Sequence, residues 1–282
     1  MRMKRYTVSL VAAVLSLGLL AGCGGSPTNQ PVSGEEGQGE KVTLKVGATP
    51  VPHAEILEFI KPMAAEQGID LQIIEFTDYN LPNRALADGE LDANYFQHEP
   101  YLTTFVTETK KDLVSAGAVH LEPLGFYSLK FADISEIPDG GEITIPADPS
   151  NCGRALNLLA QSGLITLKEG VGVLATIKDI QDNPKNLRFT MLDAESLSRT
   201  LPDVEASVIN TNYYLEAQKN LGIDAHVLAR ESAENNPYAN IVAIRKGDEN
   251  RPEIQKLIQL LQSDEVRQFI ETKYGGAVIP AF

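Results

Sequence analysis

The regular alternation of strand-like and helix-like segments after residue 40 is the feature that most restricts the fold. Residues 41–49 alternate apolar and polar side chains, as a half-buried strand does, and residues 53–68 then place apolar residues at helical spacing. The same strand-then-helix order repeats at 69–76 with 81–89 and at 91–96 with 100–112. This order is typical of βαβ units, which build a parallel sheet with helices packed on it.

A second series of the same kind begins near residue 142. Residues 113–141 lack helical spacing and indicate a long extended crossover that ends in a turn-rich patch. Strands are then predicted at 142–148, 187–193, 206–210 and 239–247, and helices at 150–165, 212–222, 251–263 and 264–276. We predict two α/β lobes with a ligand cleft between them and two crossover strands. The predicted lobes are 41–127 with 238–282, and 128–237.

The first 22 residues have the pattern of a bacterial export signal. Three basic residues precede the apolar run VSLVAAVLSLGLLAG, which is too short for a comfortable membrane span. Small residues lead directly to Cys23, as in lipoprotein signals, and 24–40 are rich in Gly, Ser, Pro, Gln and Glu. We predict a signal peptide at 1–22, and a tether at 23–40 that begins with the lipidated Cys23. An ordinary secretory peptide with an incidental cysteine is the alternative.

Lipidation determines the expected location. Multiple acyl chains, palmitate among them, would hold Cys23 at a membrane surface, whereas one chain would bind only marginally. We therefore expect a protein anchored to the cell membrane and facing its extracytoplasmic side.

Charge and motif content exclude several functions. The formal net charge is −14, so no basic surface for nucleic acid is indicated. The chain has no Walker A loop, no H-E-x-x-H and no C-x-x-C, and its GVGVLA run does not lie between a clear strand and a helix. The four histidines are scattered along the sequence, so we predict no metal site and no cofactor.

Cys152 is the only thiol left if Cys23 carries lipid, so no disulfide framework can form. A thiol hydrolase that uses Cys152 and His98 is one possible function. No local motif supplies a base for Cys152, which favours a bystander role and a protein that is not an enzyme.

The stretch LDANYFQHEPY, residues 91–101, gathers aromatic side chains at the end of a predicted strand. Strand alternation places Phe96 and His98 on one face and Tyr95 and Gln97 on the other. Phe96 and His98 would then lie at the carboxyl end of a parallel strand, where the cleft opens, and Tyr101 follows in the next helix. The alternative places Phe96 in the core and His98 on the surface.

Polar residues follow three other predicted strands. Arg154 lies in the first turns of a helix that Asp148 can cap, where helix dipole and guanidinium would attract a carboxylate. Asn210 and Asn240 stand at an end of the strands 206–210 and 239–247, and an asparagine can both donate and accept hydrogen bonds. A surface arginine and ordinary turn asparagines are the alternatives.

Several long motifs resemble the methionine-binding lipoproteins, also called the NlpA lipoprotein family, over nearly all of 41–282. They are KVGATPVPHAEILE, EFTDYNLPNRALADGELDANYFQHEPYL, EPLGFYSLK, IPADPSNCGRALNLLAQSGLI, NPKNL, PYANIVAIRKGD and KYGGAVIPAF. The resemblance implies a two-lobed periplasmic-binding-protein fold that closes on a free amino acid. It implies binding of methionine, with the L isomer expected, and delivery to an ABC permease and ATPase complex.

The resemblance also implies roles for single residues. Tyr79, Phe96 and His98 would form an aromatic pocket for the thioether, with Tyr101 close by, and sulfur contacts aromatic edges favourably. Arg154 would bind the ligand carboxylate, and Asn210 and Asn240 would contact the polar end of the ligand.

The chain departs from the family at a few positions. Val51 stands where the family commonly has glycine, and Cys152 stands where it often has glutamate. Thr211 and Tyr214 replace smaller residues of the usual run near the expected cleft. A different amino acid, a methionine derivative or a dipeptide is therefore the alternative ligand.

Overall fold

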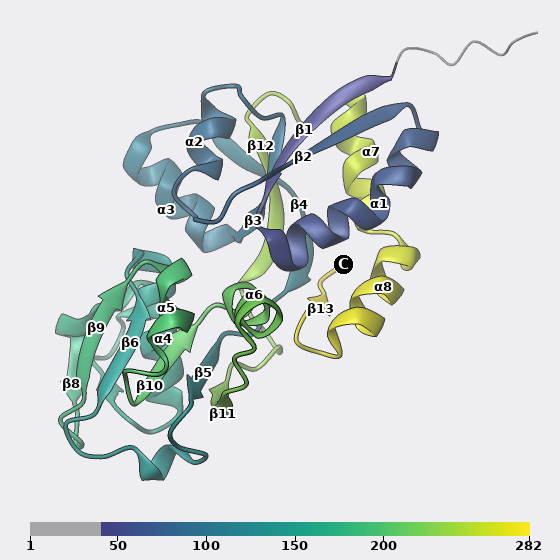
Figure 1. The fold of residues 1–282 in the computed structure, drawn as a ribbon. Helices are drawn as coiled ribbons and strands as arrows, with labels where there is room; N and C mark the ends of the chain where they lie inside the picture. Colours follow the sequence, from purple (N-terminus) through teal and green to yellow (C-terminus); the bar gives the residue numbers. More distant parts are fainter. Residues whose placement is uncertain (1–40) are drawn as a thin grey trace, which may run out of the picture. The chain divides into compact units, whose positions relative to one another are not determined.

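Two large β-sheets with helices on both faces and one small two-stranded sheet make up residues 41–282, the part of the chain that this computed structural model describes (Figure 1). The predicted signal peptide, Cys23 and the tether lie outside these residues. No helix among the described residues has the length and apolar character needed to span a bilayer.

The first lobe is built on a six-stranded sheet in the order β13-β4-β12-β3-β1-β2. β1 pairs in parallel with β2 and β3, whereas β12 runs antiparallel to both β3 and β4. The strands are β1 (Val42–Ala48), β2 (Ile69–Glu75), β3 (Ala93–His98), β4 (Leu113–Leu121), β12 (Ala239–Arg245) and β13 (Ile279–Pro280). The helices are η1 (Pro50–Ala54), α1 (Glu55–Glu66), α2 (Pro82–Ala87), α3 (Glu99–Thr109), α7 (Pro252–Leu261) and α8 (Asp264–Tyr274).

The two faces of this sheet bury different helices. Val242 and Ile244 of β12 pack with α1, α7 and α8, so the C-terminal helices lie beside the N-terminal one (Figure 1). Ile241 and Ala243 point to the other face and pack with α2 and α3, as the two-residue period of a strand requires.

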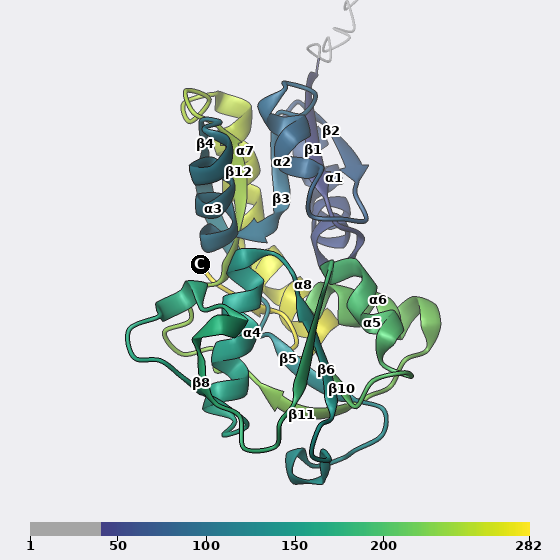
Figure 2. The ribbon, with the colours of Figure 1, turned by 90° about the vertical axis from the view of Figure 1, so that its left-hand side faces the viewer.

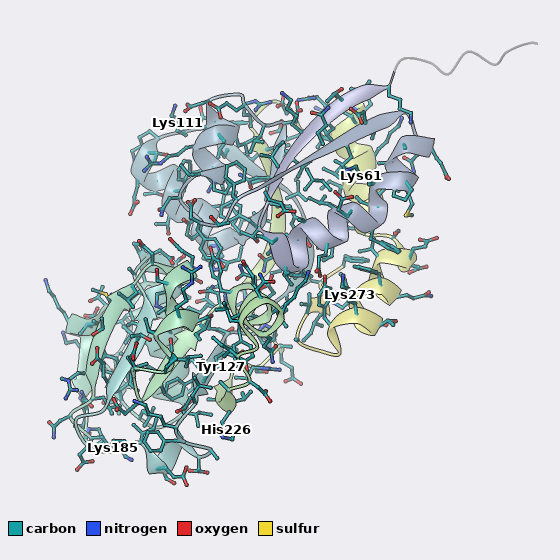
Figure 3. All side chains as sticks on the ribbon, in the orientation of Figure 1. Lys61, Lys111, Tyr127, Lys185, His226 and Lys273 are labelled. Atoms are coloured by element: carbon teal, nitrogen blue, oxygen red, sulfur yellow. The ribbon has the colours of Figure 1, made fainter. Side chains whose placement is uncertain are left out.

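The second lobe is built on a five-stranded sheet in the order β11-β5-β10-β6-β9. In Figure 2, α4 lies on one side of these strands and α5 with α6 on the other, each over its own apolar cluster. Tyr127, labelled in Figure 3, stacks on Tyr214 with ring centroids 3.8 Å apart. The strands are β5 (Gly125–Ser128), β6 (Glu142–Pro146), β9 (Arg188–Leu192), β10 (Ala206–Ile209) and β11 (His226–Arg230). The helices are α4 (Pro149–Gln161), α5 (Ala194–Thr200) and α6 (Thr211–Leu221), with 3₁₀ turns η2 (Ile134–Glu136), η3 (Gly172–Leu174) and η4 (Ile177–Asp179) and a small hairpin of β7 (Thr166–Leu167) and β8 (Ile180–Asp182).

The chain changes sheet twice, as predicted, but the first change comes earlier. The segment predicted as a single long crossover contains both β4 and β5, and β5 pairs with β10 and β11 of the second sheet. The lobe boundary predicted after residue 127 therefore falls inside a strand, and the connection spans 122–124. The second connection spans 231–238 and contains the predicted boundary at 238.

Candidate functional site

All seven predicted ligand-binding residues line one cavity. It contains about 310 Å³ of space not occupied by atoms, its open mouth included. The predicted lining residues are Tyr79, Phe96, His98, Tyr101, Arg154, Asn210 and Asn240. Thr211, expected near the cleft, also lines it, together with four residues that the sequence did not indicate: Gln97, Glu122, Asn151 and Asn212.

Residues of both lobes meet around the cavity. The hydroxyl of Tyr79, which precedes α2, donates a hydrogen bond to Oδ1 of Asn212 on α6 over 2.6 Å. Nε2 of His98, at the end of β3, lies 2.9 Å from Oδ1 of Asn151 on α4. Nδ1 of His98 accepts from the backbone N–H of Tyr101, which leaves Nε2 as the donor to Asn151. The lobes are therefore in direct contact at the rim of the site.

A β-bulge in β3 changes which side chains reach the cavity. The pairing with β12 skips Phe96, because Val242 opposes Tyr95 and Ile241 opposes Gln97. The Gln97 amide consequently bonds to Asn94, from which strict alternation would separate it. The prediction that Gln97 points away with Tyr95 is therefore wrong. Tyr95 itself does not line the cavity, and its hydroxyl bonds to His120.

Three aromatic rings form an apolar wall. The ring centroids of Tyr79 and Phe96 lie 5.7 Å apart, and Tyr101 lies 5.8 Å from each of them. Tyr213 packs behind this wall, with its ring centroid 4.9 Å from that of Tyr79, but does not line the cavity. Tilted and edge-on rings of this kind suit an uncharged, polarizable side chain such as a thioether.

Arg154 is the cationic group of the site. Asp148 caps α4 and accepts from the N–H of Asn151, which places Arg154 in the second turn of the helix. The Arg154 side chain is only 3% exposed, which excludes the alternative of a surface arginine. Its Nε and Nη2 atoms donate to Glu231 over 2.8 and 2.6 Å, and Nη2 also donates to the Glu122 carbonyl over 2.8 Å. Within residues 41–282, Nη1 makes no hydrogen bond, so it is free to bind an anion.

Glu122 is the anionic group and lies in the first connection between the lobes. Its Oε1 atom is 2.7 Å from His120 Nε2 and 3.3 Å from His53 Nε2, while Oε2 accepts from the Asn212 N–H over 2.8 Å. Burial raises the pKa of the Glu122 carboxyl. Burial also lowers the pKa of His53 to about 4 and that of His120 to about 3. Both histidines are thus neutral at neutral pH, and the carboxylate can attract a cation into the cavity.

His53 and His120 are distant in sequence but adjacent in space, so their spacing along the chain did not reveal that they form a cluster. Their ring centroids lie 4.9 Å apart, and the atoms that they and Glu122 could offer to a metal lie within 4.8 Å of one another. The remaining ring nitrogens bond to the hydroxyls of Thr49 and Tyr95. Hydrogen bonds alone satisfy this cluster, and the absence of a metal site stays a prediction.

Two amide atoms in the cavity lack partners. Oδ1 of Asn210 and Nδ2 of Asn212 are buried and make no hydrogen bond within the described residues. A buried polar atom without a partner is costly, so this acceptor and this donor indicate a polar ligand. Together with Arg154 and Glu122 they suit a molecule that carries both a carboxylate and an ammonium group.

Two sequence departures prove remote from the cavity. Cys152 is 6% exposed and belongs to an apolar cluster of the second lobe. Its Sγ lies 4.0 Å from Sδ of the exposed Met191 on β9. Burial raises the pKa of this thiol to about 11, which disfavours the thiolate. His98 pairs with Asn151 instead, so the geometry contradicts the thiol-hydrolase alternative. Tyr214 packs on Tyr127 and does not line the cavity, whereas Thr211 does.

Comparison with known proteins gives consistent matches. The sequence profile of the NlpA lipoprotein family matches residues 44–282. The methionine-binding lipoprotein MetQ of Bacillus subtilis is 42% identical over 282 residues, covering 99% of both chains. A nutrient-binding protein from Burkholderia cenocepacia, solved bound to methionine, has a TM-score of 0.80 and 43% identity, covering 85% of this chain and 100% of its own. A periplasmic substrate-binding protein of an ABC transporter from Coxiella burnetii has a TM-score of 0.78 and 41% identity, covering 84% and 100%.

Proposed function

Because the chain belongs to the NlpA lipoprotein family, we propose that it is the substrate-binding protein of an ABC importer and that it binds methionine, with the L isomer expected. The observation that carries this proposal is the grouping of one buried cation, one buried anion and an aromatic wall around a single cavity. A free amino acid with an apolar side chain complements all three. The relatives named for methionine support the choice of ligand.

The geometry suggests which protein group contacts each part of the ligand. Nη1 of Arg154 would receive the carboxylate, and a charge-assisted bond of this kind is among the stronger polar contacts. Glu122 and Oδ1 of Asn210 would accept from the ammonium group, with Asn240 beside them. Tyr79, Phe96 and Tyr101 would surround the thioether. His98 would stay neutral, since burial lowers its pKa to about 3.

Binding would occur by closure of the two lobes without chemistry on the ligand. The connections at 122–124 and 231–238 are the segments about which the lobes would rotate. The first connection ends where β5 begins, because residues 125–128 are already paired in the second sheet. The closed form would dock on the permease and ATPase complex, which would open it to release methionine.

A titration of the purified full chain in detergent tests the ligand. We expect L-methionine to bind, and D-methionine, methionine sulfoxide, leucine and a methionine dipeptide to bind more weakly. Tight binding of another member of this panel, with none of L-methionine, would replace methionine as the ligand. Thr211, the one departure that lines the cavity, is the observation that favours testing this alternative.

Membrane attachment has a separate test. We propose lipid on Cys23 and an anchor that faces the extracytoplasmic side. Phase separation in detergent should place the full chain in the detergent phase and the Cys23→Ala variant in the aqueous phase. Equal partitioning of the two would contradict lipidation at Cys23.

A further inference from the structure

Glu231 is a largely buried carboxylate that lies outside the cavity lining but holds the cation of the cavity, Arg154. It follows β11, at the start of the second connection, and its side chain is 10% exposed. Its Oε1 accepts from Arg154 Nε over 2.8 Å, and its Oε2 accepts from Arg154 Nη2 over 2.6 Å. This fork-to-fork pairing fixes the plane of the guanidinium group.

The same carboxylate joins the two connections between the lobes. Oε2 also accepts from the Leu124 N–H over 2.9 Å and from Asn236 Nδ2 over 3.3 Å. In return, the Glu231 N–H donates to the Leu124 carbonyl over 2.9 Å. Arg154 bonds to the Glu122 carbonyl in the first connection as well. The arginine is thus held at the crossing of both connections.

We propose that Glu231 is a positioning residue for ligand recognition, which orients Arg154 so that Nη1 faces the ligand carboxylate. This inference rests on the proposed function. Glu231 occupies the Nε and Nη2 edge of the guanidinium, so the ligand is left with the Nη1 end. Glu231 also binds Leu124 and Asn236, which lie in the two connections about which the lobes would rotate. Displacement of Arg154 from Glu231 would therefore loosen these connections as well.

Substitution by glutamine breaks this arrangement in a defined way. Three donors converge on Oε2, so the amide oxygen of a glutamine would stay at that position. Its NH₂ group would then face the Arg154 Nε–H, and two donors cannot bond to each other. One half of the fork is lost, together with the negative charge that compensates the buried guanidinium.

The test compares two ligands on three proteins. We expect Glu231→Gln to weaken L-methionine binding on the order of tenfold or more, because an arginine that is no longer held contacts the carboxylate poorly. L-methioninamide lacks that carboxylate but keeps the ammonium and thioether groups, so its affinity should fall much less. Glu234→Gln is the matched control, since Glu234 is exposed in the same connection and its loss changes the charge equally.

Glu231→Asp separates positioning from a purely structural role. This variant keeps a carboxylate and should bind L-methionine at least about threefold more tightly than Glu231→Gln. Unchanged methionine binding by Glu231→Gln would overturn the inference, and so would equal losses for methionine and methioninamide, or equal weakness of the Asp and Gln variants. Failure of the unaltered chain to bind methionine would overturn the proposed function and, with it, this inference.

Discussion

The two charged ends of the cavity are both buried, but the protein holds them by different means. Arg154 is paired with a carboxylate, Glu231, through two short hydrogen bonds. Glu122 is held by two histidines, which burial keeps neutral, and by one backbone N–H. The orientation of the cationic end is therefore fixed by a charge-assisted pair of hydrogen bonds. Within residues 41–282 the Glu122 carboxylate forms no salt bridge with a lysine or arginine, although the charge of Arg154 favours its ionised form. Its attraction for a cation therefore depends on its own protonation state.

This difference indicates what each end contributes to a bound amino acid. At the cationic end, the fixed carboxylate already compensates the charge, so geometry determines how well a ligand carboxylate is received. At the anionic end, an arriving ammonium group would supply the missing counter-charge for Glu122. We expect substitutions of Arg154 to remove both the charge that attracts the ligand carboxylate and the group that orients it. Substitutions of Glu122 should act mainly by removing the charge that attracts the ammonium group.

The largest effect should come from Arg154→Ala. We expect methionine affinity to fall on the order of 100-fold or more, because the ligand carboxylate loses its cation and Glu231 loses its charged partner. Calorimetric titration measures the loss, and Arg188→Ala, at an exposed position on β9, is the control. Unchanged binding by Arg154→Ala would remove the carboxylate role and the comparison based on it.

Glu122→Gln should have the next largest effect. The amide keeps the shape of the side chain but offers no charge to the ammonium group, so we expect affinity to fall on the order of tenfold. The same titration with Glu90→Gln, an exposed site outside the cavity lining, controls for net charge. If both variants bind like the unaltered chain, Glu122 is not the ammonium partner and the ligand must be oriented otherwise.

The affinity of the unaltered chain should fall as the solution is acidified from pH 7.5 to 5.5. Burial raises the pKa of Glu122, so protonation begins above its usual range and removes the anion that the ammonium group needs. His53, His98 and His120 stay neutral over this interval, because their pKa values are about 4, 3 and 3. The loss cannot exceed about tenfold per pH unit for one proton.

Glu122→Gln provides the check on this pH effect. Titrations at three pH values should show a slope in the unaltered chain and almost none in the variant. An equal slope in both proteins would assign the proton to another group.

Tyr79→Phe should have the smallest effect on affinity, and it should affect the cationic and the anionic end of the cavity equally. It removes the hydroxyl that bridges the lobes to Asn212 but leaves the ring in the aromatic wall. We expect a loss of roughly threefold to tenfold in affinity for methionine and methioninamide alike, which is the usual value of one neutral hydrogen bond. A loss confined to one of the two ligands would show that Tyr79 favours one charged end.

Much of the fold and the predicted part of the site follows from local patterns. Alternating strand and helix periods predicted the α/β class, and the motifs around Phe96, Arg154 and Asn240 carried the resemblance to the family. Each of these motifs stands at a strand end or helix start. In a two-lobed α/β protein, strand ends and helix starts lie at the edge of each sheet where the ligand cleft opens, so these motifs are expected to meet there.

The residues that escaped prediction depend on distant contacts. Glu122 and Glu231 lie in connections without periodicity, and Glu231 meets Arg154 across 77 residues of chain. Gln97 reaches the cavity only because β12, far along the chain, pairs with β3 across a bulge. One sequence signal could have pointed to these two residues. Each connection between the predicted lobes contains a glutamate next to strand-like sequence, and a connection that is simply solvent-exposed does not need an acidic side chain at that position.

Residues 125–230 form a continuous insertion within the first lobe, because β4 and β12, the strands on either side of it, are neighbours in one sheet. The second lobe is therefore encoded by one continuous gene segment, which can be exchanged as a unit. Exchanging it between relatives would transfer Arg154, Asn210 and Asn212 as a set, while Tyr79, Phe96 and Glu122 stayed behind. Such chimaeras would show whether the two halves of the recognition site can evolve separately.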